Sequence, residues 1–409
     1  MKDELIQHLF RQEFAKMVAV ISRLYGLEHI EIAEDVVSET FLQATELWHS
    51  RGVPPNPTAW LYAVAKQKTL YHFRRTKIFN DKVLPQVRAS QQWATEPEEV
   101  DFSESNIKDS QLRMMFAVCN PSIASEAQIG LALRILCGFT IEEIAEAFLT
   151  NKETINKRLY RARERLRLSN LTLEHPSSTE LNNRLDNVLH IIYLLFNEGY
   201  YSTTSNQTLR EDLCAEALRL ALSLTAFETT DQPKTNALIA LMFFHASRFN
   251  ARQTGDNNLV LYEEQNIELW DQQLINRGTH HLELAAAGTT ISSYHLEAGI
   301  AFWHCQKTDS AEKWSNILEH YDLLMKLNDS PIVSLNRAYA LYKAKGQQIA
   351  IGEVEQLQLI HNHFYFTLLG ELYTGIDNEK AIEHFKAAIK LAKTETDKNT
   401  ITLKMKRLK

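Results

Sequence analysis

Apolar residues recur every three to four positions along most of the chain, which is the period of an amphipathic α-helix. In the segment 10–24, for example, Phe14, Met17, Val18 and Ile21 fall on one helical face. We find no alternating run of β-branched residues long enough to anchor a sheet, and helix breakers are scarce, with 13 Gly and 9 Pro among 409 residues. The pattern therefore predicts an all-α fold, and the length predicts two or three domains.

The segment 129–168 is the most informative, because its pattern predicts three short helices in close succession. The first helix is apolar nearly throughout and ends at Gly138. The second and third helices each begin with a capping box, at Thr140–Glu143 and Thr150–Glu153. Two helices joined by a tight turn, the second of them basic, are typical of a helix-turn-helix, whose second helix can enter the DNA major groove.

Positive charge is concentrated on the last of these helices. It contains seven Lys and Arg residues and only two acidic residues, Glu153 and Glu164, although the whole chain has a net charge of −7. A solvated helix packed on two others would carry similar charges, but a basic stripe on a motif of this length favours DNA binding. The residues predicted to contact DNA from this helix are Lys152, Thr154, Asn156, Lys157, Arg158, Arg161 and Arg163.

A first helical unit is predicted over residues 1–79, and its second helix, at 32–48, presents an acidic outward face with Glu34, Asp35 and Glu39. After a Pro-rich break at 51–57, a helix over 58–75 mixes basic with aromatic residues. Basic groups hold phosphates and aromatic faces stack on unpaired bases, so this mixture favours melted DNA, although some of its apolar residues fit a core equally well. The predicted contacts are Trp60, Lys66, Lys68, His72, Arg74 and Arg75.

The helical period is lost over residues 80–106, which are rich in Ser, Gln and Glu. We interpret this segment as a flexible linker to a second compact unit over 107–170. The order of these motifs resembles an extracytoplasmic-function (ECF) sigma factor of the sigma-70 family. Residues 33–48 are similar to its polymerase-clamp helix, 56–75 to the helix that opens the minus-ten element, and 139–166 to its minus-thirty-five reader.

The resemblance implies that the partners are core RNA polymerase, contacted by Glu34, Asp35 and Glu39, and promoter DNA. It implies transcription initiation without catalysis by this chain. One residue departs from the family pattern, because Tyr71 stands where members usually carry Asp before the paired arginines. The alternative is a helical-repeat interaction protein or a stand-alone helix-turn-helix regulator that does not bind core polymerase.

The second half resembles the long helical extension of one ECF subfamily. We expect a helical extension domain over 180–315 and TPR-like repeats over 316–409, since Ala338 and Gly370 occupy equivalent repeat positions. The net charge, counted from Lys and Arg against Asp and Glu, is −1 over residues 1–175 and −6 over the rest of the chain. This acidic balance excludes the second half as the main nucleic-acid surface. We expect this extension to regulate the first half, either directly or through a protein or peptide partner.

Other chemistry finds little support in the sequence. Four scattered cysteines, an amphipathic N-terminus and no long apolar stretch favour a cytoplasmic protein without a membrane segment. No histidine pattern has metal-ligand spacing and no Gly-rich phosphate loop is present, so we expect no metal, no cofactor and no enzyme activity. We interpret Phe196–Tyr200 as a helix end closed by Gly199, in preference to a ligand pocket with Arg248, Glu263 and Gln265.

Overall fold

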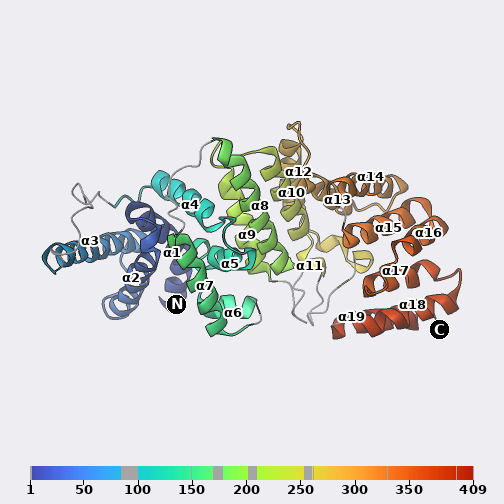
Figure 1. Cartoon of the computed structure of the whole chain (residues 1–409), viewed down its shortest axis with the longest axis horizontal. Helices are drawn as coiled ribbons and strands as arrows, with labels where there is room; N and C mark the ends of the chain where they lie inside the picture. The colour runs from blue at the N-terminus through green and yellow to red at the C-terminus, as the bar shows by residue number, and fades with distance from the viewer. Residues whose placement is uncertain are drawn as a thin grey trace. The chain divides into compact units, whose positions relative to one another are not determined.

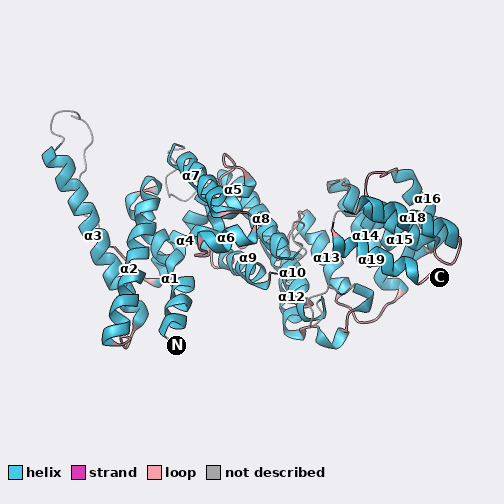
Figure 2. Ribbon diagram, turned by 90° about the horizontal axis from the view of Figure 1, so that it is seen from below, coloured by secondary structure: helices cyan, strands magenta, loops and turns pink. Residues whose placement is uncertain are grey.

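The computed structural model describes residues 2–83, 100–148, 150–168, 178–200, 210–252, 260, 262–328, 330–392 and 394–408. In these ranges the regular secondary structure is entirely helical, and Figure 2 shows no strand there. The predicted all-α fold is confirmed. Contacts divide the chain into two compact units, Met1–Leu195 and Phe196–Lys409, which we call unit 1 and unit 2 (Figure 1).

Unit 1 is built on its N-terminal helix, against which the next helices of the unit pack. Its elements are α1 (Lys2–Tyr25), η1 (Leu27–His29), α2 (Ile30–Arg51), α3 (Pro57–Val83), α4 (Glu104–Val118), α5 (Ser125–Leu131), the π-helical turn η2 (Ala132–Leu136), α6 (Ile141–Ala147), α7 (Lys152–Leu168) and most of α8 (Ser178–Tyr200). The predicted apolar face of α1 is confirmed, since Phe14, Met17, Val18 and Ile21 are all buried. The helix α3 adds Leu61 to this core.

The predicted linker over 80–106 is helical at both ends, because α3 continues to Val83 and α4 begins at Glu104. Its residues 84–99 lie outside the described residues. The predicted domain boundaries near 170–180 stay predictions. In the structure α8 begins inside unit 1, where the Asn187 side chain donates hydrogen bonds to the Cys119 carbonyl and, at 2.9 Å, to Gln128.

The helix-turn-helix forms where the sequence predicts it. Gly138 ends the preceding apolar segment with a φ of 69°, a conformation that glycine adopts without strain. The Thr140–Glu143 capping box is present at the start of α6. The second predicted capping box is wrong in its first residue, because the Asn151 side chain, rather than Thr150, accepts a hydrogen bond from the Thr154 amide at 2.8 Å. Asn is as good an N-cap as Thr, so the helix start shifts by one residue.

Unit 2 is a succession of helices in which neighbours along the chain pack on one another (Figure 1). Its elements are α9 (Glu211–Leu224), α10 (Pro233–Ala246), α11 (Phe249–Arg252), η3 (Tyr262–Glu264), η4 (Ile267–Leu269), α12 (Gln272–Ala285), α13 (Ser293–His304), α14 (Ala311–Leu327), α15 (Pro331–Lys345), α16 (Gln347–Leu357), α17 (His363–Tyr373), α18 (Asn378–Leu391) and α19 (Glu395–Lys406). The predicted repeat positions Ala338 and Gly370 are buried in α15 and α17. TPR-like repeats remain a prediction.

The interpretation of Gly199 as a helix end is wrong. The helix α8 runs through Gly199 to Tyr200. A Cβ at Gly199 would lie 2.7 Å from the Arg210 carbonyl oxygen and from the Cys214 sulfur. The glycine therefore permits the close approach of α8 and the segment that opens α9, and the sequence pattern did not reveal this tertiary requirement.

Candidate nucleic-acid and protein interfaces

The helix α7 presents a basic face to solvent. Its buried positions, Ile155, Leu159, Ala162 and Leu166, repeat at intervals of three and four and attach the helix to the core. On the opposite side, the exposed residues among the predicted DNA contacts are Lys152, Thr154, Asn156, Lys157 and Arg161. The first turns of the helix therefore carry polar side chains, which suit base edges, between cations, which suit phosphates.

Three of the predicted DNA contacts on α7 form ion pairs within unit 1, and one of them, Lys152, pairs with Glu142 at 2.6 Å while both side chains stay exposed. The Arg163 side chain is only 17% exposed, and its Nη2 lies 2.6 Å from a Glu34 carboxylate oxygen. Arg158 is 28% exposed and forms an ion pair with Glu126 at 3.1 Å. Both arginines are therefore only partly exposed, because each forms an ion pair with an acid on another helix, and their contact with DNA stays a prediction.

One exposed residue of this face was missed by the sequence reasoning. The Tyr160 ring is 58% exposed and lines a shallow surface depression together with Asn156, Lys157 and Arg161. The helical spacing could have predicted this position, because Tyr160 follows Asn156 by four residues and so lies directly beside it on the helix. A charge-based selection passed over this uncharged residue.

The helix α3 exposes a row of side chains along one face, which ends in an aromatic ring and a cation. Its exposed positions are Ala59, Ala63, Gln67, Tyr71 and Arg74. Tyr71, which replaces the usual Asp, is 68% exposed. Small side chains occupy only the first half of this stripe, at Ala59 and Ala63, and longer polar or aromatic side chains occupy the second half.

The remaining predicted contacts on α3 are less accessible. Lys66, Lys68 and His72 are partly buried, and Lys68 lies 3.3 Å from Glu39. The Trp60 ring packs edge-on against Trp48 with centroids 5.4 Å apart, so it contributes to the core. The side chain of Arg75 lies outside the described residues.

The other aromatic rings of this helix serve packing. Phe73 stacks on Tyr25 with ring centroids 3.5 Å apart, and Tyr62 stacks on Phe102 at 4.7 Å. The Tyr62 hydroxyl donates a hydrogen bond to Glu13 at 2.5 Å. Burial, together with this carboxylate, raises the pKa of the Tyr62 phenol, which therefore stays protonated at neutral pH. Tyr71 is consequently the most exposed aromatic residue of the described part of α3.

Of the three acidic residues of α2 that are predicted to contact polymerase, two are exposed and one is buried. Asp35 and Glu39 face solvent, as predicted. Glu34 is only 4% exposed, so its predicted outward position is wrong. Its carboxylate accepts a hydrogen bond from Arg134 Nε at 2.7 Å and one from Arg163 Nη2 at 2.6 Å. The physical reason is pairing, since a carboxylate is tolerated in a core only when cations neutralise it.

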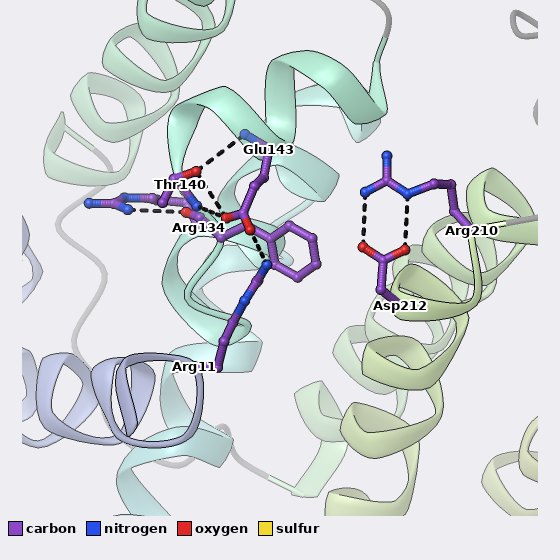
Figure 3. A network of polar contacts seen from close by, with 7 residues as sticks. Arg11, Arg134, Thr140, Glu143, Arg210 and Asp212 are labelled. Atoms are coloured by element: carbon purple, nitrogen blue, oxygen red, sulfur yellow. Dashed lines mark hydrogen bonds and ion pairs between the residues drawn. The ribbon is translucent and has the colours of Figure 1, made fainter. Parts of the chain in front are cut away.

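A second polar network ties α1 to the helix-turn-helix (Figure 3). Arg11 of α1 forms an ion pair with Glu143, and its guanidinium lies 3.9 Å from the centre of the Phe139 ring. Glu143 also closes the capping box, because one of its carboxylate oxygens accepts a hydrogen bond from the Thr140 amide at 2.8 Å. The start of α6 is therefore held both by its own cap and by a residue more than a hundred positions earlier.

Two residues of the alternative pocket in unit 2, Arg248 and Glu263, contact other side chains of that unit. Glu263 accepts a hydrogen bond from the Tyr339 hydroxyl at 2.5 Å and lies 3.4 Å from Lys343. The Arg248 guanidinium lies over the Tyr262 ring at 5.3 Å. Among the described residues, no group of three His, Cys, Asp or Glu side chains is placed to hold a metal ion. No helix in the described ranges is long and apolar enough to span a membrane.

Comparison with protein families now gives the class of protein. Residues 9–78 match sigma-70 region 2 and residues 129–166 match sigma-70 region 4. These domains are those of sigma factors, non-enzymatic subunits that bind core RNA polymerase and promoter DNA. The expectation that the chain is not an enzyme is confirmed by this match. Residues 184–286 match a family of unknown function, DUF6596.

The particular family is shown by a relative that is matched over most of its length. An uncharacterized protein of Rhizobium meliloti (strain 1021) is 31% identical over 368 residues, which cover 86% of this chain and 84% of the relative. The chain belongs to the same family as this relative, and in the chain itself the matches to sigma-70 regions 2 and 4 precede the DUF6596 match. No solved structure matches the chain significantly.

Proposed function

We propose that this protein is a sigma factor of the ECF type that directs core RNA polymerase to specific promoters and is regulated by its own C-terminal extension. The observation that carries the proposal is the exposed basic face of α7, within the region 4 match, on a chain whose net charge is −7. A cationic helix face on an anionic protein is selective for a polyanion such as DNA. The site of action is the cytoplasm, where polymerase works.

In this proposal α7 reads the minus-thirty-five element from the major groove. Thr154 and Asn156, near the start of the helix, contact base edges, and Lys152, Lys157 and Arg161 contact phosphates. The exposed face of these residues supports the assignment. Arg158 and Arg163 join the contact only when they leave their present ion pairs, and Lys152 exchanges its exposed ion pair with Glu142 for a phosphate.

The helix α3 holds the melted minus-ten strand in the same proposal. Its exposed stripe carries Arg74 for a phosphate, and the partly buried Lys66 and Lys68 flank that stripe. His72 and Arg75 complete the proposed contact set, while Trp60 supports the helix from the core. No acidic residue occurs between Pro57 and Phe79, so nothing on this segment repels a phosphate backbone.

Core polymerase docks on α2. Asp35 and Glu39 are exposed one helical turn apart, so they present two carboxylates to a basic surface. The ion pair of Glu39 with Lys68 lies at the surface and contributes less than about 1 kcal/mol, so polymerase can displace it at little cost.

The docking test uses run-off transcription with purified core polymerase on the promoter upstream of the protein's own gene. We expect the wild type to give a promoter-specific transcript and to pull down core enzyme. The variant Asp35→Lys with Glu39→Lys should lose both activities. Its control is Glu228→Lys with Glu283→Lys, which makes the same charge change on two exposed acids of unit 2. No complex between the wild type and core polymerase would refute the proposal and favour a stand-alone regulator.

The regulatory role of the extension is tested by truncation. The segment 1–200 retains α8, which bonds to unit 1 through Asn187, whereas 1–175 removes that helix. We expect residues 1–200 to differ from the full-length protein in transcript yield. Equal yields would show that the extension does not regulate transcription from this promoter.

A further inference from the structure

The short helix η3 of unit 2 lies against elements that come later in the chain. Each of its three residues contacts a positive charge from a different element, namely α14, α15 and the end of α19. The pairs are the Tyr262 hydroxyl with Lys313 Nζ at 2.8 Å, Glu263 with Lys343 Nζ at 3.4 Å, and Glu264 with Arg407 Nη2 at 2.9 Å. We call Tyr262–Glu264 the η3 segment, and the three cations the cationic face.

The first of these contacts is buried. Lys313 is only 3% exposed, and besides the Tyr262 hydroxyl it binds the Gln306 carbonyl at 2.9 Å. The Tyr262 hydroxyl in turn donates a hydrogen bond to the His304 carbonyl at 2.8 Å. Burial raises the pKa of Tyr262 to about 12, so the phenol keeps the proton that it donates. Both oxygens that bind Lys313 are uncharged, and this buried ammonium therefore retains affinity for an anion.

The second contact uses a lysine that other groups hold in place. Lys343 Nζ lies 3.4 Å from Asp309 and 5.2 Å from the centre of the Trp314 ring. Asp309 also accepts a hydrogen bond from the Trp314 indole, and the Tyr339 ring packs edge-on against Trp314 with centroids 5.7 Å apart. Lys343 and the Tyr339 hydroxyl, which both bind Glu263, are therefore positioned without the help of the η3 segment.

The contacts of the two glutamates are weak enough to exchange. Glu263, Glu264 and Arg407 are all exposed, and ion pairs at a surface add little to stability because solvent screens them. The η3 segment is a single 3-10 turn, whose hydrogen bonds have poorer geometry than those of an α-helix. A separate peptide that offers the same groups can therefore compete with the segment for the cationic face.

The chemistry of the face selects an acidic peptide. Residues 176–409 have a net charge of −6, so the cationic face is a local exception in an acidic unit. It already holds an aromatic residue followed by two carboxylates, and complementary charge gives such a contact its specificity. A nucleic-acid strand is also anionic, but Asp309 beside Lys343 and the acidic unit as a whole repel a phosphate backbone.

We propose that the cationic face is a docking site for an acidic peptide of a partner protein, and that the η3 segment occupies this site as an internal ligand until the partner displaces it. The peptide presents an aromatic residue followed by two carboxylates, as the η3 segment does. Because regulation by the extension is itself proposed above, the effect of the partner on transcription rests on the proposed function, whereas the docking site does not.

The docking site is tested with a fluorescein-labelled peptide that has the sequence of residues 260–269, added to the full-length protein and followed by anisotropy. The variant Glu263→Gln with Glu264→Gln weakens the internal ligand. It should bind the peptide about threefold or more tighter than the wild type, because a site that is mostly closed has a reduced apparent affinity.

The cations are tested in the same double-glutamine background. Adding Lys343→Gln with Arg407→Gln should weaken peptide binding about fivefold or more, since two ion pairs with the peptide are lost. The matched control is Lys326→Gln with Lys390→Gln, which makes the same charge change at two exposed lysines of α14 and α18. This control should bind the peptide as tightly as the background does.

A second readout follows the displacement of the segment itself. A dye on Glu268→Cys reports on an exposed position shortly after the η3 segment, and the four native cysteines are all buried. Saturation with unlabelled peptide should lower the anisotropy of this dye, because the displaced segment moves more freely. A peptide with Gln in place of both segment glutamates should leave the anisotropy unchanged at the same concentration.

Failure of the peptide to bind the double-glutamine variant, or binding that survives Lys343→Gln with Arg407→Gln, would overturn the docking site. Binding without a change in the dye on Glu268→Cys would overturn the role of the η3 segment as internal ligand. A single-stranded oligonucleotide that competes as well as the unlabelled peptide would overturn the choice of an acidic peptide. Peptide binding that leaves the run-off transcript yield unchanged would instead refute regulation by the extension and leave the docking site standing.

Discussion

The side chain of Arg161 offers the most direct quantitative test of the basic face of α7. It is exposed, in contrast to Arg163 two residues later, which pairs with Glu34. Arg161→Gln removes the charge while keeping a long polar side chain with good helix propensity. An exposed substitution of this kind changes the free energy of unfolding by less than about 0.5 kcal/mol, so binding is affected and folding is not.

The expected magnitude follows from counterion release. Each phosphate contact contributes about 0.9 to the slope of log affinity against log salt, so the slope for Arg161→Gln should be shallower by about that amount. Between 50 and 200 mM salt, one such contact weakens by a factor of roughly three to four. The assay is fluorescence anisotropy of a minus-thirty-five duplex at four or more salt concentrations.

The control is Arg219→Gln, because Arg219 is a partly exposed arginine of α9 in the acidic second half. Its salt slope should equal that of the wild type. If Arg161→Gln also kept the wild-type slope, the assignment of α7 as the promoter-reading helix would be refuted. A reduced slope with both variants would point to a general charge effect instead of a contact.

Further predictions concern stability and pH. Gly370→Ala should lower the free energy of unfolding by about 1–3 kcal/mol, because the new Cβ would lie 2.6 Å from the Phe385 ring. Gly352→Ala should raise the free energy of unfolding by about 0.5–1 kcal/mol, because its new Cβ would have no atom within 4 Å. Thr140→Ala should cost about 0.5–2 kcal/mol through loss of the capping box. Burial and nearby cations lower the pKa of His304 to about 3, so the folded state binds fewer protons than the unfolded state between pH 3 and 6.5. The contribution of neutral, buried His304 to the free energy of unfolding is complete above pH 6.5. It is lost as the pH falls below 6.5, by up to about 1.4 kcal/mol per pH unit.

Urea unfolding followed by circular dichroism checks these predictions. Equal midpoints for the two glycine variants would contradict the packing argument at Gly370. Thr140→Ser is the control for the cap, since it keeps a hydroxyl oxygen and should retain most of the stability. For pH, His304→Phe should flatten the decline below pH 6.5, whereas His8→Gln, at an exposed position, should leave it unchanged. An identical decline in all three proteins would exclude His304 as its source.

Local patterns explain the part of the fold that was predicted. The spacing of Phe14, Met17, Val18 and Ile21 placed them on a buried face because a helix brings positions three and four apart together regardless of what it packs on. The Thr140 cap depends on residues within one turn. Such features require no knowledge of distant segments, and the chain's helices and its helix-turn-helix follow from them.

The placement of individual charges required the tertiary structure. Glu34, Asp35 and Glu39 form one acidic group in the sequence, but the partners that bury Glu34 lie 100 and 129 positions away. Gly199 looks like a helix end, yet its role is to admit a neighbouring segment. In each case the deciding neighbour comes from another helix, and a periodic pattern contains no information about which helix that is.

The sequence by itself thus determined the helices, the basic face of α7 and the family, because these depend on period, composition and ordered motifs. Only the tertiary structure decided which charges of that face are free, since it pairs Arg163 with Glu34 and leaves Arg161 exposed. Two arginines of the same type on the same helix differ because a carboxylate is within reach of one and beyond the reach of the other. Coulomb interactions in a shielded site depend on distances of a few ångströms, and only the packed chain sets those distances.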